Sequence, residues 1–204
     1  MKTETMTTQS IIETTFANYP MIDWAMLTHA MAHYQGLGFK QVEVPWCVPE
    51  SLNIATKPHT NRSFVQTLDM FENQPHELVG SAEQGFQYCI QQGKLQPGKY
   101  WSISPCFRFD DFDALHLPWF IKLELCHILD ENQDKQTALF HMVSQCAALF
   151  DRIGSECAVV PIGDTYDIEV NGIEVGSYGI REVSNKQYIY GTGLALPRFS
   201  IANK

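Results

Sequence analysis

The stretch SPCFRFDDFDALHLPWFIKLEL, residues 104–125, decides the fold that the sequence predicts. Two apolar segments, 102–109 and 119–125, lie on either side of an acidic segment, DDFDALHLP. This order predicts two strands joined by an irregular loop. Arg108 is an isolated charge in the first strand and Glu124 is a carboxylate in the second. Because burying a charge is costly unless the charge is paired or used in binding, the hairpin is a candidate functional site.

The composition is that of a single domain with a hydrophobic core. The chain has 204 residues, of which 45% are hydrophobic, and no linker or repeat divides it. We therefore expect one domain, 1–204, with a polar and flexible arm at 1–18. The net charge of −9 argues against a broad nucleic-acid-binding surface. Six cysteines without a CxxC pair favour reduced thiols, and the lack of a signal peptide or membrane-length apolar run predicts a cytoplasmic protein.

Hydrophobic spacing and turn residues predict the remaining elements. Helices are expected at 23–35, 81–93 and 133–154; strands are expected at 39–44, 78–80, 157–161, 166–170, 173–175 and 187–190. Asn171-Gly172 predicts a tight hairpin turn, and GTGLALPRFSIANK predicts a glycine turn that leads into a final helix. Residues 50–77 are unassigned apart from a candidate strand near 63–70. Hairpins dominate, which favours an α+β fold, an antiparallel sheet flanked by helices.

Four groups of polar residues are candidate sites: Arg108 with Asp110 and His116; Ser81 with Glu83; Asp167 and Glu174 with Ser177 and Arg181; and Arg198 behind Gly191 and Gly193. Each group also has an ordinary structural interpretation. A glutamate in a first helical turn, such as Glu83, is explained by the helix dipole. The hairpin carboxylates could be solvated, and Arg108 could simply pair with Asp110 or Glu124.

Together the groups resemble one family, because the chain looks like the catalytic core of a class II aminoacyl-tRNA synthetase over nearly its whole length. GLGFKQVEVPWCVP (36–49) is similar to motif 1, CFRFDDFDALHLPWFIKLE (106–124) to motif 2, and GTGLALPR (191–198) to motif 3. GSAE (80–83) resembles the loop that contacts the ammonium of the amino acid. DIEVNGIEVGSYGIR (167–181) is similar to the metal-binding hairpin of the aspartyl, asparaginyl and lysyl enzymes, whereas motif 3 and FIKLE look more like the seryl enzymes.

The resemblance implies ATP-dependent activation of an amino acid to an aminoacyl-adenylate, with Mg²⁺. Arg108 would bind the α-phosphate and the substrate carboxylate. Arg198 would bind the γ-phosphate and stack on adenine, with Phe120 on the other face. Asp110 would contact adenine or position Arg108, His116 would contact the β- and γ-phosphates, and Asp167 and Glu174 would bind Mg²⁺. Ser81 and Glu83 would bind the ammonium group, Ser177 and Arg181 would line the substrate pocket, and Glu124 would support Arg108 at the substrate. Pro45 would lie at a homodimer interface.

Two other functions fit the same residues. Pro197 and Trp119 depart from the family motifs, which would suit a non-catalytic paralogue that acts as a binding or regulatory subunit. A ligase that passes the activated group to a protein, a carrier or a small amine would use the same adenylation. tRNA is a further acceptor, although the acidic DDFD loop would repel it, and no anticodon-binding domain is expected. The sequence names neither the amino acid nor the acceptor.

Overall fold

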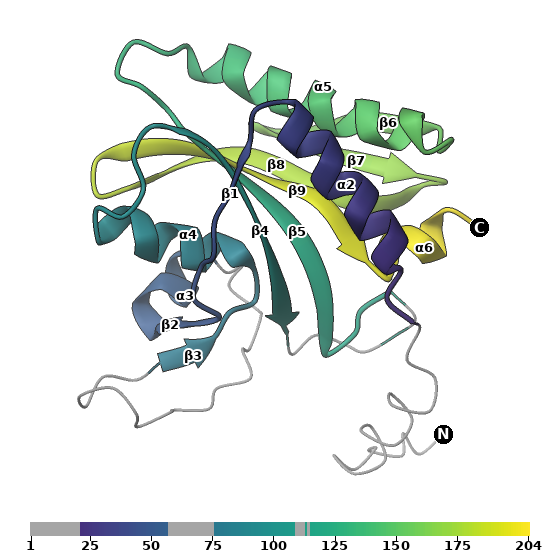
Figure 1. Cartoon of the computed structure of the whole chain (residues 1–204), viewed down its shortest axis with the longest axis horizontal. Helices are drawn as coiled ribbons and strands as arrows, with labels where there is room; N and C mark the ends of the chain where they lie inside the picture. Colours follow the sequence, from purple (N-terminus) through teal and green to yellow (C-terminus); the bar gives the residue numbers. More distant parts are fainter. Residues whose placement is uncertain (1–20, 57–75, 109–112, 114) are drawn as a thin grey trace.

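In the computed structural model of the chain (Figure 1), residues 21–56, 76–108, 113 and 115–204 are described. The elements in chain order are α2 (Trp24–Gly36), β1 (Lys40–Gln41), β2 (Cys47–Pro49), α3 (Glu50–Thr56), β3 (His76–Leu78), α4 (Ala82–Gln91), β4 (Gly98–Phe107), β5 (Trp119–Ile128), α5 (Lys135–Arg152), β6 (Cys157–Ile162), β7 (Thr165–Val170), β8 (Ile173–Val183), β9 (Lys186–Leu196) and α6 (Arg198–Ala202). The predicted α+β fold is confirmed.

The main sheet has seven strands in the order β1-β4-β5-β9-β8-β7-β6. All neighbouring strands are antiparallel except β1 and β4. The predicted central hairpin is the β4–β5 pair, in which Phe107 lies opposite Trp119 and Ser102 lies opposite Glu124. β1 is an edge strand, as the prolines that follow it predict. β2 and β3 form a separate two-stranded sheet.

Helices cover the two faces of the sheet unequally (Figure 1). α2, α5 and α6 pack on one face, where the buried core includes Tyr34, Trp101, Leu139 and Phe199. α4 packs on the opposite face, in a second cluster formed with Tyr100, Cys126 and Tyr188. Among the described residues, no helix is long and apolar enough to cross a membrane.

Most predicted elements are present, with shifted ends. The Asn-Gly turn is confirmed, because Asn171 and Gly172 both have positive φ between paired β7 and β8. Ser81 is the N-cap of α4, and Gln84, which is at the position of a capping-box partner, donates to Thr56 instead. α3 lies in the segment left unassigned. The candidate strand near 63–70 falls outside the described residues.

The prediction of a glycine turn at the start of GTGLALPRFSIANK is wrong, because β9 continues through this segment to Leu196. The glycines make room for packed side chains. A Cβ on Gly191 would lie 2.6 Å from Cδ1 of Tyr178, and a Cβ on Gly193 would lie 2.6 Å from Cδ2 of Leu123. Such contacts are too short for any larger residue. The glycines are therefore required by packing within a strand.

Gly193 is the extra residue of a β-bulge. The register passes from Leu123 opposite Leu194 to Glu124 opposite Thr192, which leaves Gly193 without an opposite residue. The bulge reverses the alternation of side chains along β9. Thr192 and Ala195 consequently both line one cavity, whereas Leu194 and Leu196 enter the core on the other face.

Candidate active site

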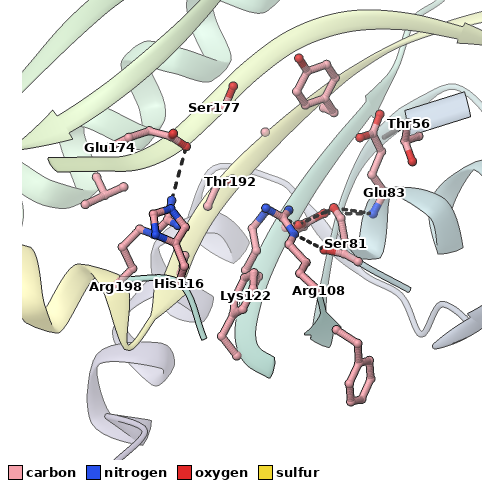
Figure 2. Close-up of a pocket in the computed structure, with 18 of the residues that line it drawn as sticks. Thr56, Ser81, Glu83, Arg108, His116, Lys122, Glu174, Ser177, Thr192 and Arg198 are labelled. Carbon is pink, nitrogen blue, oxygen red and sulfur yellow. Dashed lines mark hydrogen bonds and ion pairs between the residues drawn. The ribbon is translucent and has the colours of Figure 1, made fainter. Parts of the chain in front are cut away.

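One cavity brings together most of the residues predicted for the site. It lies beside the N-terminus of α4 and is bordered by residues of β4, β5, β8 and β9 (Figure 2). The predicted residues that line it are Ser81, Glu83, Arg108, His116, Phe120, Glu124, Glu174, Ser177, Arg181 and Arg198. Segments far apart in the chain therefore converge on one place.

The Glu124 carboxylate joins β5 to the beginning of α4. Ser81 Oγ donates to both of its oxygens, over 2.7 and 2.6 Å, and the Glu83 backbone N–H donates to it over 3.0 Å. A carboxylate at a helix N-terminus is stabilised by the helix dipole and by such hydroxyl and N–H donors. The ion-pair partner of Glu124 is Lys122, so the predicted pairing with Arg108 is wrong. The physical reason is that alternate residues of a strand share a face, which places Lys122 beside Glu124.

Arg108 is held at the mouth of the cavity by a carbonyl group and an aromatic ring. Its Nε donates to the Gly80 carbonyl over 2.9 Å, and its guanidinium lies 5.3 Å from the centre of the Phe120 ring. These contacts orient the side chain and, among the described residues, leave its terminal N–H groups for an anion. Asp110, which was predicted to position this arginine, falls outside the described residues.

Glu83 is a buried carboxylate with two partners. Arg181 Nη1 donates to it over 2.6 Å and the Tyr188 hydroxyl donates to it over 2.8 Å. Burial raises the pKa of Glu83, and the Arg181 charge opposes this effect. The Arg181 guanidinium also lies 4.5 Å from the centre of the Tyr190 ring. The residue predicted to bind an ammonium group is thus already paired with a protein cation.

Arg198 lies at the other end of the cavity, as the first residue of α6. Its Nη2 donates to the Leu115 carbonyl over 3.3 Å, and its Nη1 is 3.9 Å from Glu174 Oε1. His116 lies nearby (Figure 2), with its Nδ1 2.9 Å from Asp113 Oδ1. Hydrogen bonds from His116 and from the Leu115 and His116 N–H groups lower the pKa of Asp113 to about 2.

The two predicted metal ligands are placed differently. Glu174 lines the cavity, but Asp167 does not. The register sets Asp167 opposite Ser177 and Glu174 opposite Glu169, so the two carboxylates are not a cross-strand pair. Within the described residues, no group of three or more His, Cys, Asp or Glu side chains is placed to hold a metal ion. Of the two predicted metal ligands, only Glu174 therefore lies in the cavity.

Pro45 lies apart from the cavity, in the connection between β1 and β2. It is partly buried, and the neighbouring Trp46 is 51% exposed. The homodimer interface expected here stays a prediction. Sequence reasoning did not single out several cavity residues: Thr56, Gln84, Lys122, Tyr190 and Thr192. Only Lys122 had a usable signal, its strand alternation with Phe120 and Glu124.

The cavity carries positive charge in a chain whose net charge is −9. Arg108, Lys122, Arg181 and Arg198 all line it. Lys122 and Arg181 are neutralised by close carboxylates, whereas Arg198 has only the half-exposed Glu174 carboxylate, 3.9 Å away, as an ion-pair partner among the described residues. In the part of the chain that the structure describes, Arg108 and Arg198 are therefore the cations best placed to bind an anionic ligand such as a polyphosphate.

Solved structures with the same fold include aminoacyl-tRNA synthetases. A seryl-tRNA synthetase from Pyrococcus horikoshii complexed with ATP aligns at a TM-score of 0.71 and 18% identity over 89% of this chain and 49% of that one. A cytoplasmic serine-tRNA ligase from Naegleria fowleri in complex with AMP aligns at a TM-score of 0.70 and 15% identity. The alignment covers 88% of this chain and 52% of that one. The pyrrolysyl-tRNA synthetase PylSc from Desulfitobacterium hafniense aligns at a TM-score of 0.66 and 16% identity. The alignment covers 95% of this chain and 73% of that one.

These similarities concern the fold. A scan of protein-family models found no match, and a search of curated proteins found none. The chain spans about half the length of the two seryl enzymes. The chain therefore has the catalytic-domain fold of class II aminoacyl-tRNA synthetases.

Proposed function

We propose that this protein uses ATP to activate an amino acid as an aminoacyl-adenylate. The observation that carries the proposal is the entry of Arg108 and Arg198 into one cavity from opposite sides. They come from the end of the central hairpin and from the end of β9. A basic cavity with an aromatic ring, Phe120, suits a nucleotide triphosphate. The polar wall beside α4 leaves room for an amino acid next to it.

The proposed reaction needs positioning and charge stabilisation. The amino acid carboxylate attacks the α-phosphorus of ATP, and the bond to pyrophosphate breaks. Both reactants are anions, and negative charge increases on the phosphate in the transition state. Arg108 would bind the α-phosphate and the attacking carboxylate, and Arg198 would bind the terminal phosphate. Preorganised cations stabilise this charge, and no side-chain nucleophile is required.

Mg²⁺ fits the same cavity through one protein carboxylate. Magnesium sites in nucleotide enzymes use one or two carboxylates together with phosphate oxygens and water. Glu174 lines the cavity near Arg198 and would hold the ion. When bound, Mg²⁺ would neutralise phosphate charge. Asp167, one strand further out, remains a predicted second ligand. His116 would contact the phosphates at this end, and Asp110 would contact adenine or Arg108.

The solved neighbours support the nucleotide part of the proposal. One seryl enzyme is complexed with ATP and another with AMP. We extend this to the present chain because its cavity presents arginines at both ends. The activated amino acid would then pass to tRNA or to another acceptor. A homodimer through the region of Pro45 is part of the same proposal.

Pyrophosphate–ATP exchange tests the proposal. Wild-type protein is incubated with ATP, Mg²⁺, labelled pyrophosphate and each of the twenty amino acids in turn. Exchange that depends on one amino acid, or on a small set, is the expected result. Exchange with none, together with no ATP binding by calorimetry, would reject the proposal in favour of a non-catalytic paralogue. Product analysis with and without tRNA would then identify the acceptor.

A further inference from the structure

The two ends of the cavity differ in chemistry. Near Arg198 the wall includes the apolar residues Leu115 and Pro197. The other end is grouped around Glu83 (Figure 2). Its wall carries a polar group at each of these positions: Thr56, Gln84, Ser177, Arg181, Tyr190 and Thr192. Under the proposed function, the nucleotide takes the first end and the amino acid side chain takes the second.

The charges at the polar end are already paired with one another. Glu83 is paired with Arg181 over 2.6 Å and Glu124 is paired with Lys122. Apart from Arg108, which is proposed to bind the α-phosphate and the substrate carboxylate, these two pairs are the charged side chains around Glu83 in the part of the chain that the structure describes. A charged substrate side chain would have to separate one of these pairs, and breaking a largely buried pair is strongly unfavourable. The wall therefore disfavours both acidic and basic side chains.

An apolar side chain is disfavoured for a different reason. It would remove water from the hydroxyl groups and ion pairs of the wall without replacing the lost hydrogen bonds. The Gln84 carboxamide is the group of the wall that most clearly requires a hydrogen-bond donor. Its nitrogen donates to Thr56 over 2.5 Å, whereas its oxygen is buried and has no hydrogen-bond partner among the described residues. A substrate O–H or N–H group could satisfy that oxygen.

We propose, on the basis of the proposed function, that the activated amino acid has a neutral side chain that donates and accepts hydrogen bonds. Hydroxyl and carboxamide side chains have this property. Gln84 is the residue that determines the specificity, because its oxygen accepts from the substrate donor. Arg181 and Lys122 contribute by keeping the two carboxylates neutralised.

Pairs of amino acids with the same shape test the proposal. Serine is compared with 2-aminobutyrate, threonine with valine, and asparagine with both leucine and aspartate, by kcat/KM for pyrophosphate exchange. For the best substrate, the neutral polar member is expected to exceed its partner by about 100-fold or more, since sites built to bind a hydroxyl or amide reject analogues that lack it. Equal or faster exchange with 2-aminobutyrate, valine, leucine or aspartate would overturn the proposal.

Two matched variants test the role of Gln84. Gln84→Met should reduce the preference by roughly 10-fold, chiefly because the apolar member improves. Gln91→Met is the control, since Gln91 lies on the same helix but is exposed and does not line the cavity. Its preference should equal that of wild type. If both variants change the preference equally, Gln84 is not the determinant.

A binding measurement separates this proposal from the proposed function. Exchange with no amino acid at all would reject adenylation. The same pairs are then titrated calorimetrically into protein saturated with a non-hydrolysable ATP analogue. Tighter binding of the neutral polar members supports the selectivity even in that case. No difference within any pair rejects the selectivity as well.

Discussion

Arg181 Nη1 donates to the Glu83 carboxylate over 2.6 Å, and this ion pair joins β8 to the first turn of α4. The Glu83 side chain is 9% exposed and that of Arg181 is 32% exposed. The same carboxylate accepts from Tyr188, while the guanidinium stacks on Tyr190. One buried group therefore fixes the helix that carries the polar end of the cavity.

Removing the Glu83 carboxylate should destabilise the fold. We expect Glu83→Ala to lower the free energy of unfolding by roughly 2–3 kcal/mol, below the upper range for buried pairs because Arg181 is about one-third exposed. Urea denaturation measures this. The double variant Glu83→Ala/Arg181→Ala should lose about 1–2 kcal/mol less than the sum of the two single variants. Strictly additive losses would show that the pair contributes nothing.

The bulge at Gly193 should affect both the stability of the fold and the binding of nucleotide. The Tyr34 hydroxyl donates to the Gly193 carbonyl over 2.9 Å, and the Tyr178 hydroxyl donates to the Thr192 carbonyl over 2.6 Å. In Gly193→Ala the new Cβ would lie 2.8 Å from Tyr34 Cε2. We expect a loss of about 1–3 kcal/mol of stability and a weakened affinity for ATP, because β9 leads directly to Arg198.

Gly36→Ala is the matched control for this change. A Cβ on Gly36 would contact none of the described residues within 4 Å, and its φ is not positive. The substitution should leave ATP affinity unchanged and should alter stability by less than about 1 kcal/mol, in the stabilising direction. If Gly193→Ala binds ATP with wild-type affinity by calorimetry, the bulge does not position Arg198.

Because His127 is buried, the protein should lose stability in mild acid. Burial, with a smaller effect of Lys99, lowers its pKa to about 4. Between pH 6.5 and 4 the unfolded chain therefore binds a proton that the folded chain does not. Stability should fall by up to about 3 kcal/mol from this group as the pH decreases through that range. Chemical denaturation of wild type and His127→Gln at a series of pH values measures it.

His127→Gln should show a shallower fall over the same range. The remaining slope includes His33, whose pKa is also lowered by burial. Identical slopes in the two proteins would mean that His127 is protonated equally in the folded and unfolded chains.

The hairpins and the convergence of charged residues were accessible from the sequence, because both depend on local patterns. Turn chemistry at Asn171 and the apolar runs on either side of the 110–118 loop are local signals. Family-like spacing then predicted that Arg108, Glu83 and Arg198 would share a site, and the cavity contains all three.

The incorrect predictions concern contacts between distant segments. A sequence does not distinguish a glycine required within a strand from a glycine in a turn. The close contact between Gly193 and Leu123, which excludes a larger residue, could therefore not be predicted. Glu124 pairs with Lys122 on its own strand, whereas Arg108 turns to the Gly80 carbonyl. Such choices depend on the geometry of neighbouring strands, which no local pattern specifies.

The most direct test of the account is pyrophosphate–ATP exchange in wild type and two arginine variants. Arg108→Ala removes the cation proposed to bind the α-phosphate. Arg152→Ala removes an exposed arginine at the end of α5, a helix on the other face of the sheet. The account predicts amino-acid-dependent exchange in wild type and Arg152→Ala, and a loss of about 100-fold or more in Arg108→Ala. Undiminished exchange in a folded Arg108→Ala protein would contradict it.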